Sequence, residues 1–265
     1  MKRKGNILAI ISPKGGVGKT VTTSNIAMAL SELHKKKTLS IDTNVTTASL
    51  GFHFNLIYPK VSIYDVLKNK FDINDAVHKY SDKLHIIPSS IVIEKCDQNI
   101  DTMQKNIKKL VGHYDNILSG MVDKYDFILL DAAGGFSTES IASMKIADSI
   151  LLVTNPEYPS ILATAKCVEY AKFLKIPITG LVLTKVMGKS YELTKAEIEN
   201  ALKVKVIGEV PFDENVPKSI CHKKPIMVYK PYSKASRAYK KVASSIVGEE
   251  HDSKFHEKVR DMLGF

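Results

Sequence analysis

One stretch of the sequence, SPKGGVGKTV from Ser12 to Val21, restricts what the chain can fold into more than any other. An apolar run, NILAIIS, precedes it, and TTSNIAMALSEL follows it with apolar residues at helical spacing. A glycine-rich turn between a buried strand and a helix brings backbone N–H groups and the positive end of the helix dipole to one point. The sequence therefore predicts a phosphate-binding loop.

Each residue type in this loop has a chemical use. Glycines let the backbone approach an anion closely and turn its N–H groups inward. Lys19 supplies a positive charge for the β- and γ-phosphates, and Thr20 supplies a hydroxyl for Mg2+. The residues expected to bind the nucleotide here are Gly15, Gly16, Val17, Gly18, Lys19, Thr20 and Val21. The general motif has glycine where this chain has Pro13, and an extra lysine, Lys14, precedes the glycines.

A second motif, KYDFILLDAAGG, ends a predicted buried strand with a carboxylate, Asp131. Ligands bind at the carboxyl edge of open α/β sheets, so Asp131 is expected to hold the Mg2+ shell through water. Gly134 and Gly135 follow it and allow a mobile loop that senses the γ-phosphate. Because many strands end in aspartate, this prediction depends on the phosphate-binding loop upstream.

Short β-like runs alternate with helical runs along the whole chain. This alternation predicts an α/β fold with a mostly parallel, twisted sheet of seven to eight strands and helices on both faces. Strands are expected at residues 6–12, 37–42, 83–90, 127–130, 148–155, 177–186 and 205–211. Helices are expected within residues 22–33, 43–54, 62–69, 73–80, 101–121, 161–174, 193–202, 213–220 and 233–248.

The composition excludes some classes of protein but does not identify a binding partner. The 265 residues carry a net charge of +10, which either favours an anionic partner or serves only solubility. Three scattered cysteines without a CxxC pair argue for a reducing compartment and against a disulfide framework or a zinc site. No apolar run reaches about 18 residues, so no membrane span is expected. The expected location is cytoplasmic.

Taken together, the motifs resemble the MinD/ParA family of ATPases with a deviant Walker A loop, in the MinD-type form common in archaea. The matching segments are KGGVGKT at 14–20, IDTNVTTASLG at 41–51, YDFILLDAAGG at 125–135, VTNPE at 153–157 and VPFDENV at 210–216. The resemblance implies binding of ATP and Mg2+, a homodimer in the ATP-bound state and an activating protein partner. It also implies a role in positioning division machinery or other polar structures.

The resemblance further assigns roles to residues of this chain. Lys14 is expected to reach the nucleotide bound by the second subunit. The catalytic group is expected to contain Lys14, Lys19, Asp42 and Asn44, and the metal site Thr20, Asp42 and Asp131. The adenine site is expected to contain Thr184, Pro211 and Asp213. Residues 1–248 would form the ATPase domain, and residues 249–265 an amphipathic tail helix.

Three departures from the family pattern change these expectations. Val21 replaces a residue that often places a hydroxyl near the α-phosphate, and Thr184 stands where an asparagine usually reads adenine. The switch I pair, usually Asp-x-Asp, ends in Asn44 and leaves Asp42 as its only carboxylate. An asparagine can orient water but cannot take up a proton. ATP turnover is therefore expected to be slow.

Two further segments bear on the partner. Residues 215–248 contain no acidic residue, and the predicted helix places Lys234, Arg237 and Lys241 on one face. This face of the basic segment 218–241 is either an ordinary solvated surface or a DNA site without sequence preference, as in ParA relatives. The tail carries an apolar stripe, expected to enter an anionic membrane surface or to pack on protein, of Phe255, Val259, Met262 and Leu263.

The leading interpretation is an ATP-switched positioning ATPase bound peripherally at the inner face of the cell membrane. The basic helix suggests a first alternative, a DNA-bound partition ATPase. Asn44 suggests a second, a nucleotide-dependent scaffold that hardly hydrolyses ATP. An iron–sulfur carrier of the same superfamily is disfavoured because no CxxC is present.

Overall fold

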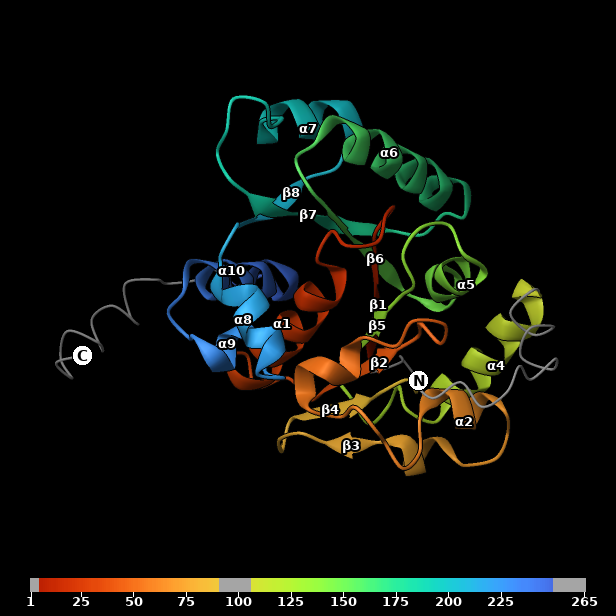
Figure 1. Cartoon of the computed structure of the whole chain (residues 1–265). Helices are drawn as coiled ribbons and strands as arrows, with labels where there is room; N and C mark the ends of the chain where they lie inside the picture. Colours follow the sequence, from red (N-terminus) through yellow and green to blue (C-terminus); the bar gives the residue numbers. More distant parts are fainter. Residues whose placement is uncertain (1–4, 91–105, 250–265) are drawn as a thin grey trace, which may run out of the picture.

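An eight-stranded sheet forms the centre of the computed structural model, which describes residues 5–90 and 106–249 (Figure 1). The strand order is β3-β4-β2-β5-β1-β6-β7-β8, and all neighbours are parallel except β3 and β4. The strands are β1 (Asn6–Ile11), β2 (Thr38–Asp42), β3 (His78–Lys79), β4 (Leu84–Ile87), β5 (Phe127–Asp131), β6 (Ser149–Thr154), β7 (Ile178–Val186) and β8 (Val206–Pro211). The predicted fold class is confirmed.

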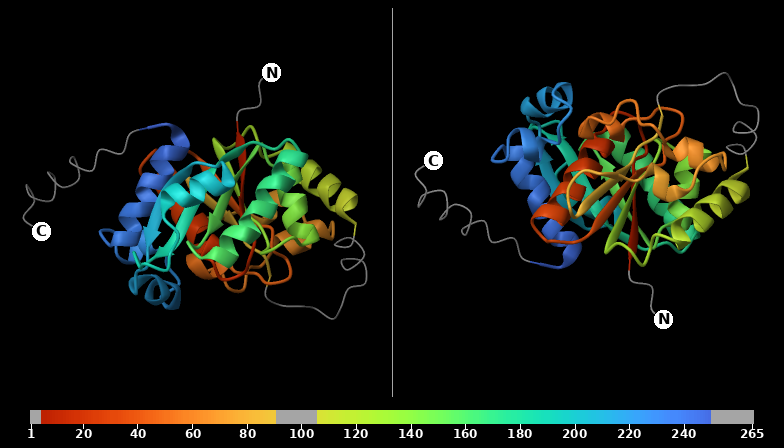
Figure 2. Two further views of the ribbon diagram at one scale, coloured as in Figure 1. Left: turned by 90° about the horizontal axis from the view of Figure 1, so that it is seen from above. Right: turned by 90° about the horizontal axis from the view of Figure 1, so that it is seen from below.

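Helices cover both faces of the sheet (Figures 1 and 2). One face is packed by α4 (Ile107–Ser119), α5 (Thr138–Ile146), α6 (Tyr158–Phe173) and α7 (Lys195–Leu202), with α2 (Ile63–Leu67) beside them. The other is packed by α1 (Lys19–Glu32), η1 (Leu50–Phe54), α9 (Ile226–Tyr229) and α10 (Lys234–Val247). The remaining short helices within residues 5–90 and 106–249 are η2 (Ile73–Ala76) and α8 (Asn215–Cys221).

The core follows the alternation of side chains along the strands. In β1, Ile7, Ala9 and Ile11 pack toward α4–α7, whereas Leu8 and Ile10 pack toward α1 and α10. All five are at most 1% exposed. A strand that is covered on both faces reads as a continuous apolar run, which explains why NILAII shows no polar alternation.

Several elements differ from the prediction. The helix expected within residues 43–54 is only the 3-10 helix η1, α6 begins at Tyr158 rather than residue 161, and α5 and α9 were not predicted. Residues 73–80 form the short 3-10 turn η2 and then β3, because His78 and Lys79 pair antiparallel with β4 instead of continuing a helix. The first helix begins at Lys19 rather than residue 22, directly after Gly18 at φ +94°. Within the expected helix 101–121, α4 begins after its cap Asn106, and residues 101–105 lie outside the described residues.

No helix in the described part of the chain combines the length and the apolar composition needed to cross a bilayer. The four apolar residues assigned to the tail, Phe255, Val259, Met262 and Leu263, lie outside the described residues. The division into a domain of residues 1–248 and a tail of residues 249–265 therefore stays a prediction.

Candidate functional site

Three neighbouring strands end at one point of the sheet. β5 lies between β1 and β2, and the parallel register aligns both Ile10 and Asp42 with Asp131. The loop of residues 12–18 leaves β1 at this edge and enters α1 directly. The fold thus brings together the glycine loop and two aspartates that are separated by about 90 residues.

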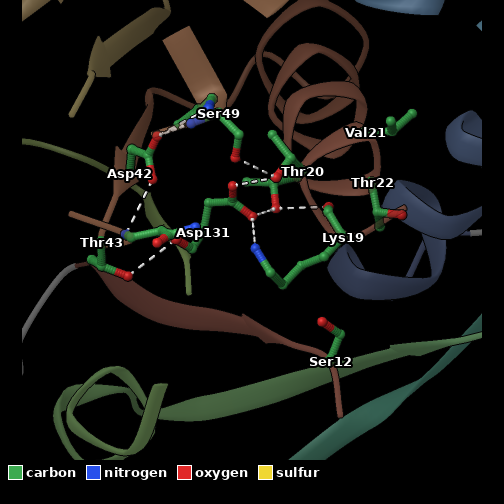
Figure 3. Close-up of polar contacts among 12 residues, drawn as sticks. Ser12, Lys19, Thr20, Val21, Thr22, Asp42, Thr43, Ser49 and Asp131 are labelled. Carbon is green, nitrogen blue, oxygen red and sulfur yellow. Dashed lines mark hydrogen bonds and ion pairs between the residues drawn. The ribbon is translucent and has the colours of Figure 1, made fainter. Parts of the chain in front are cut away.

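Asp131 is the centre of a buried hydrogen-bond cluster (Figure 3). Its Oδ1 accepts from Lys19 Nζ at 2.7 Å and from the Thr23 hydroxyl at 2.8 Å. Its Oδ2 accepts from the Thr20 hydroxyl at 2.7 Å. The Asp131 side chain is fully buried and that of Lys19 is 8% exposed. A buried ion pair is tolerated only when its remaining oxygens are satisfied, and the two threonines do this here.

The loop above this cluster has the geometry of an anion cradle. Gly16 and Gly18 have φ values of +78° and +94°, a region that residues with side chains seldom adopt. At Gly15 and Gly16 no heavy atom lies within 4 Å of the position of a Cβ, so the backbone is open to one side. The N–H groups of residues 15–20 form no hydrogen bond with any other described residue. These N–H groups are therefore available to donate hydrogen bonds to an anion.

A pocket of about 710 Å³ lies over the loop. Its wall contains the predicted residues Lys14, Lys19, Thr20, Val21 and Asn44. Sequence reasoning missed the rest of its outer wall, which consists of Lys185, Phe212, Val216, Pro217 and Ile220.

A smaller cavity of about 90 Å³ adjoins this pocket and brings together the predicted adenine-site residues Thr184, Pro211 and Asp213. The Thr184 hydroxyl donates to the carbonyl oxygen of Val17. Asp213 accepts from the backbone N–H groups of Asn215 and Ala235. Burial raises the pKa of Asp213, but these hydrogen bonds, together with those from the Asn215 and Ser233 side chains, outweigh it and leave that pKa below the usual value. Contact of these residues with adenine stays a prediction.

The switch I residues are bound within their own loop. Asp42 accepts from the backbone N–H groups of Asn44, Ser49 and Leu50 at 2.9 to 3.1 Å. Burial, followed by the nearby Asp131 carboxylate, raises the pKa of Asp42 to about 7. The Asn44 amide donates to the carbonyl and hydroxyl oxygens of Thr47 and accepts from the Thr47 N–H. Asn44 therefore stabilises the loop through both polar atoms of its side chain.

The inner wall of the site consists of Lys19 and Thr20 with the buried Asp131 beneath them. Two polar residues in contact with this wall were not predicted. Thr23 lies four residues after Lys19 on α1, so both side chains reach Asp131 from the same face of the helix. That spacing was a usable signal in the sequence. Ser49 lies 3.0 Å from the Thr20 hydroxyl through the fold of the loop after β2, and no local pattern indicates it.

The rim of the pocket combines exposed apolar side chains with the cation Lys14. Lys14 is exposed at the rim, and its ammonium group forms no hydrogen bond or ion pair with residues 5–90 or 106–249. Two large apolar side chains of the pocket lining, Phe212 and Ile220, are exposed. At the same edge of the sheet, the loops after β5 and β7 and the first residue of α6 carry further large exposed side chains, namely Phe136, Tyr158, Met187 and Tyr191.

Comparison with known proteins supplies the family. A family model described as an AAA domain matches residues 5–176. An uncharacterized ATP-binding protein of Methanocaldococcus jannaschii is 36% identical over 91% of this chain and 88% of its own. The cell division ATPase MinD of Pyrococcus furiosus superposes with a TM-score of 0.82 at 28% identity, over 92% of this chain and 99% of that one. The chain belongs to the MinD-type P-loop ATPases.

A second MinD structure bears on the ligands of this MinD-type chain. The septum site-determining protein MinD of Pyrococcus horikoshii, complexed with Mg-ADP, has a TM-score of 0.80 at 26% identity, over 96% of this chain and 98% of that one. The residues here fit such a ligand, because the Thr20 hydroxyl and the Asp131 carboxylate supply the oxygen atoms that Mg2+ prefers. The described residues contain no group of three or more His, Cys, Asp or Glu that would hold a metal alone.

Proposed function

We propose that this MinD-type protein is a slow, Mg2+-dependent ATPase that forms a homodimer with ATP and acts as a spatial switch at a membrane surface. One observation carries the proposal: the inner wall of the pocket is complete, whereas its rim is not. Lys19, Thr20 and Asp131 satisfy one another inside the chain. Lys14 lies beside the same pocket, exposed and without a partner among the described residues. A second copy of the chain would supply what the rim lacks.

Phosphoryl transfer to water requires positioning and neutralisation of charge more than covalent chemistry by the protein. The N–H groups of residues 15–20 and the Lys19 ammonium group would hold the β- and γ-phosphates. Mg2+, held through Thr20 and Asp131, would neutralise charge on the phosphate oxygens. Lys14 of the second copy would add a cation in trans, and the exposed apolar side chains around the rim would be covered between the two copies.

Slow turnover is supported by the switch I loop. Asn44 uses its amide to hold Thr47, and it carries no charge with which to attract a proton. Asp42 is buried behind three backbone N–H groups, so its access to a water molecule is restricted. An ATP-dependent dimer without detectable turnover would instead favour the nucleotide-dependent scaffold.

The dependence of turnover on protein concentration tests the proposal. If Lys14 acts in trans, turnover per chain rises with concentration until the dimer is saturated. Lys14→Met should remove this rise and lower turnover by about tenfold or more, while ADP affinity changes less than twofold. Lys195→Met removes the same charge from the exposed side of α7 and serves as the control. Turnover per chain that is independent of concentration in both proteins would contradict the dimeric site.

The membrane part of the proposal depends on the tail. With Mg-ATP, the full chain should sediment with vesicles of phosphatidylcholine and phosphatidylglycerol, and a chain ending at residue 249 should not. Equal sedimentation of both chains would remove the membrane and leave the nucleotide-driven dimer. The cell division role of the relatives, and an activating protein partner, remain part of the proposal.

One observation favours a second candidate function on DNA. The side chains of Lys234, Arg237 and Lys241 are exposed and line a groove of about 330 Å³ between α10 and the edge strand β8. A row of cations beside a groove attracts a phosphate backbone, and such binding weakens steeply with salt. ATP-dependent retardation of plasmid DNA, lost between 50 and 200 mM salt and lost in Arg237→Gln, would support this candidate. No retardation at low salt would exclude it.

A further inference from the structure

Two consecutive residues at the end of β7 bind two consecutive carbonyl groups of the phosphate-binding loop. Lys185 Nζ donates to the carbonyl oxygen of Gly16 at 2.7 Å. The Thr184 hydroxyl donates to the carbonyl oxygen of Val17. We propose that Thr184 and Lys185 are positioning residues that hold the loop in its phosphate-binding conformation before the nucleotide arrives. This inference rests on the proposed function of the pocket as an ATP site.

The planarity of the peptide bond explains how these contacts act on the pocket. In a trans peptide unit the carbonyl of one residue and the N–H of the next point in opposite directions. The Gly16 carbonyl shares its unit with the Val17 N–H, and the Val17 carbonyl shares its unit with the Gly18 N–H. Holding both carbonyls from the β7 side therefore directs both N–H groups away from β7, where they are free to meet a phosphate.

Thr184 is held rigidly enough to act as an anchor. It is 2% exposed, and its hydroxyl oxygen also lies 3.0 Å from Asn155 Oδ1 and 3.2 Å from the carbonyl oxygen of Thr154. Thr154 and Asn155 belong to the VTNPE segment at the end of β6. The proposed ATPase mechanism gives this segment no role of its own. A Cβ placed on Gly18 would lie 3.7 Å from the Thr184 hydroxyl oxygen, so the strand end packs directly on the loop.

Lys185 adopts a backbone conformation that its side chain disfavours. Its φ is +56°, in the left-handed region, and the pairing of β7 with β8 is irregular between Leu183 and Val186. Non-glycine residues held in this region concentrate at functional sites, where surrounding contacts compensate for the strain. Here the irregularity turns the lysine out of the strand, and its ammonium group reaches Gly16 from the exposed side.

A loop held in advance loses less conformational freedom when a ligand binds. Because the contact is to the loop and not to a particular phosphate, its effect should be similar for ADP and ATP. It should appear in affinity and KM, and kcat should change little. This also gives a physical use for Thr184, at a position where the sequence departs from the pattern of the family that it resembles.

Lys185→Met in the full chain tests the proposal. The affinity for ADP, measured by titration calorimetry, should fall about fivefold, the size expected for one exposed hydrogen bond to a charged group. In the nucleotide-free protein, 15N relaxation should show lower order parameters at Gly16, Val17 and Gly18. The value of kcat at saturating ATP should stay within about twofold.

Three further variants complete the test. Lys185→Arg keeps a donor and should restore most of the affinity, and Thr184→Val should weaken ADP binding where Thr184→Ser does not. Lys189→Met, an equal change of charge on the exposed loop that follows, should leave both affinity and order parameters unchanged. Unchanged order parameters in Lys185→Met, or a fall in kcat with unchanged affinity, would overturn the inference. A wild-type chain that bound no nucleotide would refute the proposed function instead. The order parameters would still test whether Thr184 and Lys185 hold the loop.

Discussion

The inner wall of the nucleotide pocket and its outer rim are built from different kinds of residues. Lys19, Thr20 and Asp131 of the inner wall are largely buried, and each has partners in the same chain. Lys14 and Phe212 of the rim are exposed. This difference supports the proposal that one chain binds the nucleotide and that a second copy completes the rim. Changes at the inner wall should therefore impair a single chain, and changes at the rim should impair only the assembly.

The largest expected effect on turnover tests the inner wall. Asp131→Asn removes the counter-charge of the buried Lys19 and a carboxylate of the proposed metal shell. Mg2+-dependent turnover should fall about 100-fold. The free energy of unfolding in urea should fall by about 3 kcal/mol, because an unpaired buried cation remains.

Asp115→Asn on the exposed side of α4 is the matched control and should change neither quantity. Full turnover in Asp131→Asn would show that the inner wall is not the metal site.

The second effect concerns how the free energy of unfolding depends on pH through Asp42, whose carboxyl lies near Asp131. Asp42 has a pKa of about 7 in the folded chain against 3.8 for an ordinary aspartate. Below pH 4 both states are protonated and the contribution of Asp42 to stability is fully present. As pH rises toward 7 the unfolded chain loses this proton first, so the folded state loses stability on the order of 4 kcal/mol.

Urea unfolding of the nucleotide-free protein between pH 4 and pH 8 measures this slope. Asp42→Asn resembles the protonated acid and should have a flatter profile than the wild type over this window. Parallel profiles would show that the Asp42 carboxyl titrates as in water.

The third effect concerns the loop between the inner wall and the rim. Asn44→Asp restores a carboxylate that can take up a proton, and steady-state turnover should rise about tenfold. ADP affinity should change little. Asn116→Asp on the surface of α4 is the control. If turnover stayed at the wild-type rate, slow hydrolysis would have another cause than the missing carboxylate.

The smallest effect tests the wall next to the adenine cavity. Val21 is half-buried and lines both cavities. Val21→Thr adds a hydroxyl near the expected α-phosphate and should tighten ADP binding about threefold. Titration calorimetry measures it, with Val111→Thr on α4 as the control for the change in side chain. Weaker binding would mean that the hydroxyl finds no acceptor there.

The inner wall was largely predictable from sequence because its signals are local. The apolar run before Ser12, the glycines and the aspartate that ends KYDFILLD are each read from a few neighbouring residues. The parallel register then brings Asp131 beside the loop without further information. The sheet was predicted for the same reason, since each strand carries its own apolar pattern.

Apart from Lys14, the rim was not predictable from the sequence, and neither were the hydrogen bonds from Thr184 and Lys185 to the loop. Both arise between segments that are far apart in the chain. Lys185 contacts Gly16 across 169 residues, and nothing in either segment indicates the other. The exposed Phe212 lies in a short loop where apolar and polar residues are equally plausible. β3 was misread as a helix because two residues are too few to show alternation, and only the pairing with β4 decides its conformation.

Static light scattering of the full chain tests the central claim most directly. With Mg2+ and a non-hydrolysable ATP analogue, the account predicts a mass of twice the 29.4 kDa of one chain, and with Mg-ADP a mass of 29.4 kDa. The same mass with both nucleotides would contradict it.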